Sequence, residues 1–204
     1  SSIQRLLNVI FPLITFPYIS HTLSVESVGK YNFSSSVVGY FILIAGLGIN
    51  TFAVREGARF RNDRKKISQF ASEVFTINLL AALISYILLF LCLVYVKKLQ
   101  PYCICILILS IQIIFTVLGT EWVYVIFEEY TYITIRNIAF KIFSIFLMFL
   151  FVRNQQDYLY YAIITLIANA GAYVLNFINC KNYCDLKITL NVRWIELLKP
   201  ILII

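Results

Sequence analysis

Six apolar runs, separated by short polar segments, dominate the pattern of this chain. Each run is close to the roughly 20 residues that a helix needs to cross a bilayer. The apolar residues follow one another without strict alternation, which predicts membrane-spanning helices rather than the strands of a barrel. The predicted spans cover approximately residues 3–20, 37–54, 74–96, 101–118, 138–152 and 158–178.

The loops between these runs are too short to hold a soluble domain. The predicted fold class is therefore all-α transmembrane, with residues 1–199 forming a bundle of six helices. Residues 200–204 are apolar after Pro200 and are predicted to begin a seventh helix. The chain opens without Met, on two serines inside a predicted helix. We therefore expect it to be the N-terminal half of a longer protein, with the C-terminal half absent.

Composition supports lipid as the solvent for most side chains. Hydrophobic residues make up 61% of the chain and charged residues only 13%, with a mean hydropathy of +0.85. A soluble domain typically carries about 25% charged residues. The net charge of +7 does not indicate a nucleic-acid partner, because the cations lie in short loops between apolar runs.

Those loop cations predict how the chain is oriented. Lys and Arg accumulate in cytoplasmic loops, and alternate loops here differ strongly in their content of these residues. One side would carry all but four of the 17 Lys and Arg residues. This predicts a multi-pass protein of a bacterial inner membrane with a cytoplasmic N-terminus. The four cations on the other side are Lys30, Lys97, Lys98 and Arg153.

Polar residues inside or beside spans are candidates for function, because ionisable groups are costly in a membrane. Arg5 precedes Ser20 by about 22 Å of helix, less than the ~30 Å hydrocarbon core, so it would lie inside the membrane, with Asn8 one turn later. Arg55 directly follows the second span and could bind phosphate with its planar fork. The alternatives are that Arg5 snorkels to the interface and that Arg55 is an ordinary topology signal.

Residues 119–137 mix aromatic rings with acidic and basic side chains. One interpretation is a vestibule for a sugar head group, because rings stack on sugars and cations bind pyrophosphate. The other is an interfacial belt of Tyr and Trp residues. The candidate residues of this vestibule are Glu121, Trp122, Glu128, Arg136 and Lys141.

The sequence contains no recognisable catalytic set. It has no nucleotide-binding loop, no histidine pair and no nucleophile elbow. Cys180 and Cys184 have a metal-like spacing, but His21, the single histidine, is far away in sequence. We therefore expect no catalytic residue, no cofactor and no metal, and a protein that is not an enzyme.

Several motifs occur in the order known from one transporter family. The run Phe-Pro-Leu-Ile-Thr-Phe-Pro-Tyr-Ile-Ser at 11–20 resembles the first helix of Wzx-type O-antigen and capsule repeat-unit flippases. Val-Gly-Lys-Tyr-Asn-Phe at 28–33 and Leu-Gly-Ile at 47–49, followed by Arg55, resemble the second helix and the segment before it. The connection from Trp122 to Arg136 resembles the link between helices four and five. Family members often have Gln-Gly where this chain has Val125 and Ile126, which puts the local backbone bend in doubt.

The resemblance implies a polysaccharide transporter of the MOP exporter superfamily, with 12–14 helices in two pseudo-symmetric bundles. It implies an undecaprenyl-pyrophosphate-linked oligosaccharide as substrate, moved across the inner membrane by alternating access for O-antigen, lipopolysaccharide or capsule synthesis. Partners would be this substrate, membrane lipids, and the polymerase and chain-length proteins of the same pathway. The alternatives are a multidrug or other lipid exporter of the same superfamily and a membrane polysaccharide polymerase.

Overall fold

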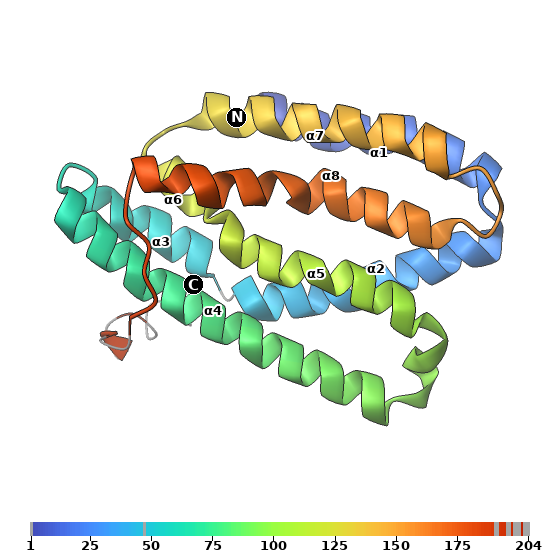
Figure 1. Ribbon diagram of the computed structural model, residues 1–204, viewed down its shortest axis with the longest axis horizontal. Coiled ribbons are helices and arrows are strands. Elements are labelled where there is room, and N and C mark those ends of the chain that lie inside the picture. The colour runs from blue at the N-terminus through green and yellow to red at the C-terminus, as the bar shows by residue number, and fades with distance from the viewer. Residues whose placement is uncertain (1, 47, 190–191, 195–196, 198–200, 202–204) are drawn as a thin grey trace.

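The computed structural model describes residues 2–46, 48–189, 192–194, 197 and 201, and for residues 2–9 the course of the backbone only. Long helices lie side by side along one axis and form a bundle (Figure 1). No strand occurs in the described ranges. The helices are α1 Ser2–Thr22, α2 Val25–Gly46, α3 Ile49–Gly57, α4 Arg64–Tyr95, α5 Cys103–Gly119, α6 Glu121–Ile126, α7 Tyr130–Phe151 and α8 Tyr158–Asn179, with 3-10 turns η1 Ala58–Phe60, η2 Lys97–Tyr102 and η3 Cys180–Asn182.

The outer faces of these helices are apolar and exposed. Large side chains such as Leu83, Phe90 and Phe146 point away from the bundle, which lipid tolerates and water does not. Five helical stretches among the described residues are long and apolar enough to cross a membrane, and α1 is a further helix of 21 residues. The predicted fold class, an all-α transmembrane bundle, is confirmed. The five stretches are Val25–Phe60, Arg64–Tyr95, Lys97–Ile126, Tyr130–Phe151 and Tyr158–Asn182.

The second predicted span, 37–54, differs from the structure at both ends. The helix begins at Val25, because the Ser24 hydroxyl accepts the backbone N–H of Ser27 at 3.1 Å and caps the first turn. Its first turns carry Glu26 and Lys30, an ion pair at 2.7 Å that hydropathy cannot detect. The helix then ends before Gly48, whose φ of 70° starts the separate helix α3. One predicted span therefore corresponds to two helices.

Two other helices begin earlier than their apolar cores. Helix α4 starts at Arg64 rather than at 74, and its 32 residues extend about 48 Å, well beyond the ~30 Å apolar core of a bilayer. Helix α7 starts at Tyr130 rather than at 138. In both cases the added turns are polar, so hydropathy marks only the part of the helix that faces lipid. The sixth predicted span, 158–178, agrees with α8 to one residue.

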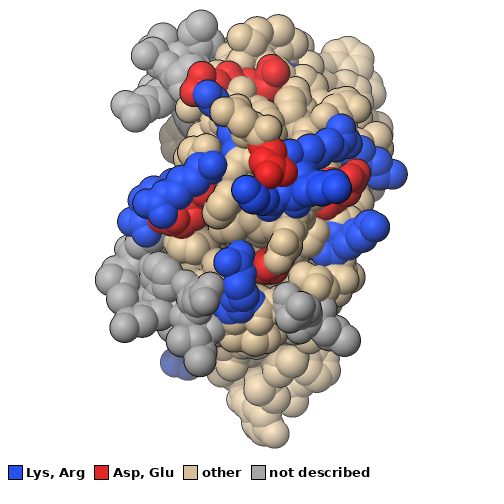
Figure 2. All heavy atoms as spheres, turned by 90° about the vertical axis from the view of Figure 1, so that its left-hand side faces the viewer, with Lys and Arg blue, Asp and Glu red and all other residues tan. Residues whose placement is uncertain are grey.

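The connections between helices gather at two ends of the bundle (Figure 1). One end holds residues 57–64, residues 119–130 and the chain after Asn179, and we call it the basic end. Viewed directly, it shows a band of Lys and Arg side chains interrupted by acidic ones (Figure 2). The opposite end holds residues 22–25, 95–103 and 151–158.

Helix α5 packs against α8 and α2, and α7 packs against α8 and α1. The α7–α8 contact is close enough that a Cβ added to Gly171 would lie 2.7 Å from the Phe140 ring. Hydrogen bonds between neighbouring helices add to this packing. They are expected in a membrane, because lipid provides no hydrophobic driving force for helices to associate. The Ser85 hydroxyl donates to the Phe41 carbonyl, and the Tyr86 hydroxyl donates to the Ser110 carbonyl, both at 2.7 Å.

The start of α4 supplies a prediction about pH. The Asp63 carboxylate accepts the backbone N–H groups of Lys65 and Lys66 at 3.1 and 3.2 Å. These bonds, that of Lys66 above all, lower the pKa of Asp63. Because the folded-state pKa is the lower one, the cap stabilises the helix fully above the unfolded value of about 3.9 and is lost as pH falls through the folded value.

We therefore expect amide exchange in the first turn of α4 to be slow near about pH 6 and faster near about pH 3, after correction for intrinsic rates. Hydrogen–deuterium exchange with mass spectrometry measures this. Asp63→Asn, which caps without titrating, should remove the pH dependence. Equal protection at both pH values in the unmodified protein would contradict the assignment.

Candidate functional site: a buried arginine network

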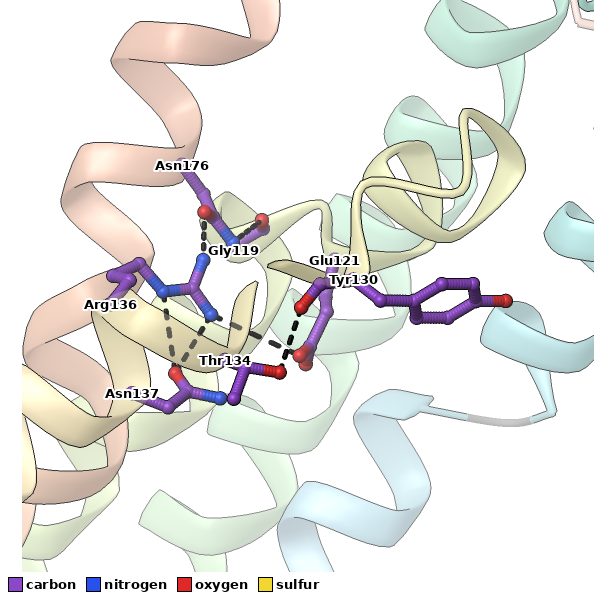
Figure 3. A network of polar contacts seen from close by, with 7 residues as sticks. All are labelled: Gly119, Glu121, Tyr130, Thr134, Arg136, Asn137 and Asn176. Carbon is purple, nitrogen blue, oxygen red and sulfur yellow. Dashed lines mark hydrogen bonds and ion pairs between the residues drawn. The ribbon is translucent and has the colours of Figure 1, made fainter. Parts of the chain in front are cut away.

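One cation lies inside the bundle near the basic end. Arg136, in the second turn of α7, has a side chain that is only 3% exposed. The α7 backbone directs it away from the outer surface, towards α8 and the junction of α5 and α6 (Figure 3). A charge in such a place is costly unless it is paired and hydrogen-bonded. Its neighbours therefore have to supply acceptors.

The guanidinium finds these acceptors on three elements. From α7 itself, the Asn137 amide oxygen accepts from Nε at 3.3 Å and from Nη2 at 2.9 Å. From α8, the Asn176 amide oxygen accepts from Nη1. From α6, the Glu121 carboxylate lies 3.9 Å from Nη2 and balances the charge (Figure 3). Tyr132 and Tyr173 place their rings 5.8 and 5.9 Å from the guanidinium carbon, within the range of cation–π attraction.

Asn176 joins more elements than any other residue of this network. Its side-chain oxygen accepts from Arg136 on α7, and its side-chain nitrogen donates to the carbonyl of Gly119, the last residue of α5, at 2.8 Å. Its own backbone carbonyl accepts the Tyr124 hydroxyl of α6 at 2.6 Å. Asn176 is fully buried. One residue of α8 therefore connects α5, α6 and α7, through its side-chain amide and its backbone carbonyl.

The short helix α6 is bounded by two residues with left-handed backbone. Thr120 has φ 39° and Glu128 has φ 61°, and neither is glycine. Non-glycine residues adopt this conformation at a cost, so the surrounding contacts have to hold it. The sequence left the bend near Val125 and Ile126 in doubt. In the structure the chain bends at both ends of α6, and these two residues lie between the bends.

Glycine at position 119 is required by packing. A Cβ at Gly119 would lie 2.5 Å from the Tyr173 ring, which is closer than real contacts allow. The end of α5 therefore touches α8 with its backbone. This contact brings the Gly119 carbonyl within reach of Asn176, so the packing and the polar network depend on each other.

Glu121 and Arg136, two of the eight predicted site residues, meet in this network. The Trp122 indole is 2% exposed and belongs to the core formed by α3, α4 and α6; the structure therefore places it inside, not along an open vestibule. Its Nε1 has no hydrogen-bond partner among the described atoms. Glu128 is exposed and pairs with Arg61 at 2.8 Å, which connects the turn after α6 to the turn before α4.

Two other predicted site residues, Arg55 and Lys141, make their described contacts outside the network. The Arg55 side chain is 58% exposed, and its Nε lies 3.3 Å from the Glu56 carboxylate. Lys141 is half-buried, with its ammonium 5.5 Å from the centre of the Phe11 ring of α1. Arg5 and Asn8 lie on α1, but their side chains are outside the described part of the structure.

Sequence reasoning missed two polar residues that the structure shows to be central. Asn176 lies in the apolar run of α8, and the rule that polar groups in a span need partners could have found it. Glu73 is fully buried in α4, where its carboxylate accepts from Gln69 at 3.2 Å and from Arg193 at 3.1 Å. Hydropathy places Glu73 in a loop, so the sequence offered no sign of its burial.

The contacts of the network join α5, α6, α7 and α8. Cys180 and Cys184 bring their sulfur atoms to 3.7 Å as free thiols. Among the residues that the structure describes, no group of three or more His, Cys, Asp or Glu side chains could hold a metal ion.

The fold and this network first define the class: a multi-pass α-helical membrane protein whose helices are joined through a buried cation. Comparison with known proteins then gives the family. The family described as "Polysaccharide biosynthesis protein" matches residues 1–196. The chain therefore belongs to this family, and the resemblance to polysaccharide transporters is confirmed.

Two curated relatives have the printed name "Putative O-antigen transporter". The protein from Escherichia coli (strain K12) is 23% identical over 150 residues, which cover 74% of this chain and 36% of the relative. The protein from Shigella dysenteriae is 28% identical over 153 residues, which cover 74% and 37%. The matched segment thus covers little more than a third of the length of these relatives. No solved structure matches this chain.

The network predicts a large effect of one substitution. Asn176→Leu keeps the volume but leaves the Nη1 group of Arg136 without its acceptor and the Gly119 carbonyl without its side-chain donor. We expect a loss of roughly 3 kcal/mol, seen as a lower unfolding midpoint of the detergent-purified protein. Asn169→Leu is the matched control, because Asn169 lies two turns earlier on α8 and is exposed. Equal midpoints for the two variants would contradict the role of Asn176.

Proposed function

We propose that this chain forms the N-terminal half of a flippase that moves undecaprenyl-pyrophosphate-linked oligosaccharide units across the bacterial inner membrane. The observation that carries the proposal is the family match over residues 1–196, together with two relatives named as O-antigen transporters. The protein would act by alternating access between two bundles of similar construction, and it would carry no catalytic residue. Its product would serve O-antigen or capsule synthesis.

The proposed substrate carries a pyrophosphate, and this charge needs compensation during transport. An unpaired ion in a low-dielectric medium is very costly. Arg55 supports such a role, because its guanidinium is more than half exposed and only loosely paired with Glu56. Arg5, on the backbone of α1, is the second candidate. Arginine suits the task because its fork meets two phosphate oxygens and stays charged at all relevant pH values.

Arg136 would have a different task in this proposal. Its guanidinium is enclosed and charge-balanced by Glu121, so the substrate reaches it only if α6 moves away from α8. We therefore assign it a positioning role: it holds the α6 segment against α8 while the exposed cations contact the substrate. Lys141, whose ammonium lies near the α1 ring of Phe11, would support the same inner face.

The proposal places the basic end in the cytoplasm. A single cysteine at Arg64→Cys, in a protein lacking the five native cysteines, should be protected from an impermeant maleimide added outside intact spheroplasts. Lys97→Cys, at the opposite end, should react. Labelling at position 64 from outside, with position 97 protected, would show that the protein has the opposite orientation.

The substrate-binding role of Arg55 has a direct test. Arg55→Ala in the full-length protein should lower surface polysaccharide about tenfold or more, because charge-assisted hydrogen bonds to phosphate are lost. Arg5→Ala should act in the same direction. Arg55→Lys should restore part of the activity, since charge survives while the two-point geometry does not.

The matched control is Arg59→Ala, which removes an exposed cation one turn later that pairs with Glu56. It should leave export nearly unchanged. Immunoblotting of membranes verifies that each variant is inserted at the normal level. Normal export by both Arg55→Ala and Arg5→Ala would show that these arginines do not bind the pyrophosphate, even though the family assignment would stand.

A further inference from the structure

After η3 the chain does not leave the bundle but runs back along α4. Figure 1 shows it descending from the end of α8 towards α4 at the basic end. We call residues 184–189 the strap. It forms neither helix nor strand, yet every second backbone N–H group from Asp185 to Thr189 donates to a side chain of α4.

The strap is held by a row of hydroxyl groups on α4. Positions 68, 72 and 76 are Ser, Ser and Thr, four residues apart, so they form one stripe along the helix. Four residues of helix rise about 6.0 Å, and two residues of extended chain span about 6.6 Å, so alternate strap amides meet successive hydroxyls. The backbone N–H of Asp185 donates to the Ser68 hydroxyl at 3.0 Å. The N–H of Lys187 donates to the Ser72 hydroxyl and that of Thr189 to the Thr76 hydroxyl, both at 3.1 Å.

This docking forms an open groove of about 530 Å³ between the strap and the first turns of α4. Three cations line it, Arg64 and Lys65 from α4 and Lys187 from the strap, together with one carboxylate, Asp185. The backbone N–H of Lys187 is hydrogen-bonded to the Ser72 hydroxyl. This bond holds the Cα of Lys187 in place on the wall of the groove. The cations of the two walls therefore face a common space.

The positive charges in this groove are only partly neutralised by their neighbours. Arg64 donates to the Lys181 carbonyl at 3.0 Å and lies 3.7 Å from the Asp185 carboxylate. Lys65 and Lys187 form no ion pair with any described residue. The lining thus carries a net charge of about +2 at pH 7. A solvated anion with several acceptor oxygens is the complementary ligand.

The groove also lies at the polar end of α4, before the helix surface becomes apolar. Along α4, the first large apolar side chain exposed on the surface is Leu80, about 12 Å beyond Ser72. On the strap, Ile188 follows Lys187 in sequence and is 67% exposed. Cations next to exposed apolar side chains are typical of a membrane interface. A lipid can place its phosphate in the groove and its acyl chains against these side chains.

We infer that the groove between α4 and the strap is a binding site for the phosphate of an anionic membrane lipid. Arg64, Lys65 and Lys187 contact the phosphate oxygens, and Asp185 limits the affinity by repulsion. The site is separate from the Arg136 network and from Arg55. It does not depend on the proposed substrate, so either proposal can fail without the other.

The test measures lipid retained by the purified protein. The protein is reconstituted in phosphatidylcholine nanodiscs with a small fraction of phosphatidylglycerol, and native mass spectrometry after release counts the bound phosphatidylglycerol. Lys65→Gln and Lys187→Gln should each weaken retention about fivefold. Asp185→Asn should strengthen it, which loss of a structural contact would not do.

Lys66→Gln is the matched control, because it removes the same charge one residue away, where Lys66 pairs with Asp63 at 3.4 Å outside the groove. It should change retention by less than about twofold. An equal loss for Lys65→Gln and Lys66→Gln would mean diffuse attraction to the basic end and would overturn the site. Displacement of the lipid by millimolar inorganic phosphate would show a site for free phosphate, and would overturn the lipid assignment.

Discussion

The buried ion pair and amide contacts of Arg136 are the constraint on which the basic end of this bundle depends. Inside a bundle surrounded by lipid, no water is available to solvate a guanidinium, so protein groups have to supply its acceptors. Asn137, Asn176 and Glu121 do so from three different helices. Satisfying one cation therefore fixes how α6 and α7 lie against α8.

The same constraint explains the unusual backbone around α6. Left-handed conformations at Thr120 and Glu128 are costly for non-glycine residues. They persist because Tyr124 is bonded to the α8 backbone, Trp122 is packed in the core, and Glu128 is paired with Arg61. A helix of six residues held between two such bends is a small rigid unit.

Polar groups at the basic end also hold the chain that follows α8 against α4. The strap satisfies its backbone donors on the hydroxyl stripe of α4, and Arg193 reaches the buried carboxylate of Glu73. In this way the chain that follows the sixth membrane helix is tied to the third one. Helix α4 thus extends beyond the membrane to provide a docking surface, which accounts for its length of 32 residues.

The sequence by itself determined the fold class, the approximate number of spans and the alternation of basic loops. It could do so because lipid demands continuous apolar runs, and this demand is local in sequence. It also identified Glu121 and Arg136 as polar residues in an unusual place. It did not locate the starts of α2, α4 and α7, because these turns are polar and form helix through caps and ion pairs that hydropathy does not register.

Only the tertiary structure decided which polar residues meet. Asn176 lies 40 residues from Arg136 in sequence, and nothing in either local pattern pairs them. The structure also placed Trp122 in the core, Arg55 at the surface and the strap against α4. These outcomes depend on which helix faces pack together, and helix packing is set by side-chain fit between segments distant in sequence. A pattern of apolar and polar residues indicates that a buried charge needs a partner. Which residue becomes that partner is decided by the fold.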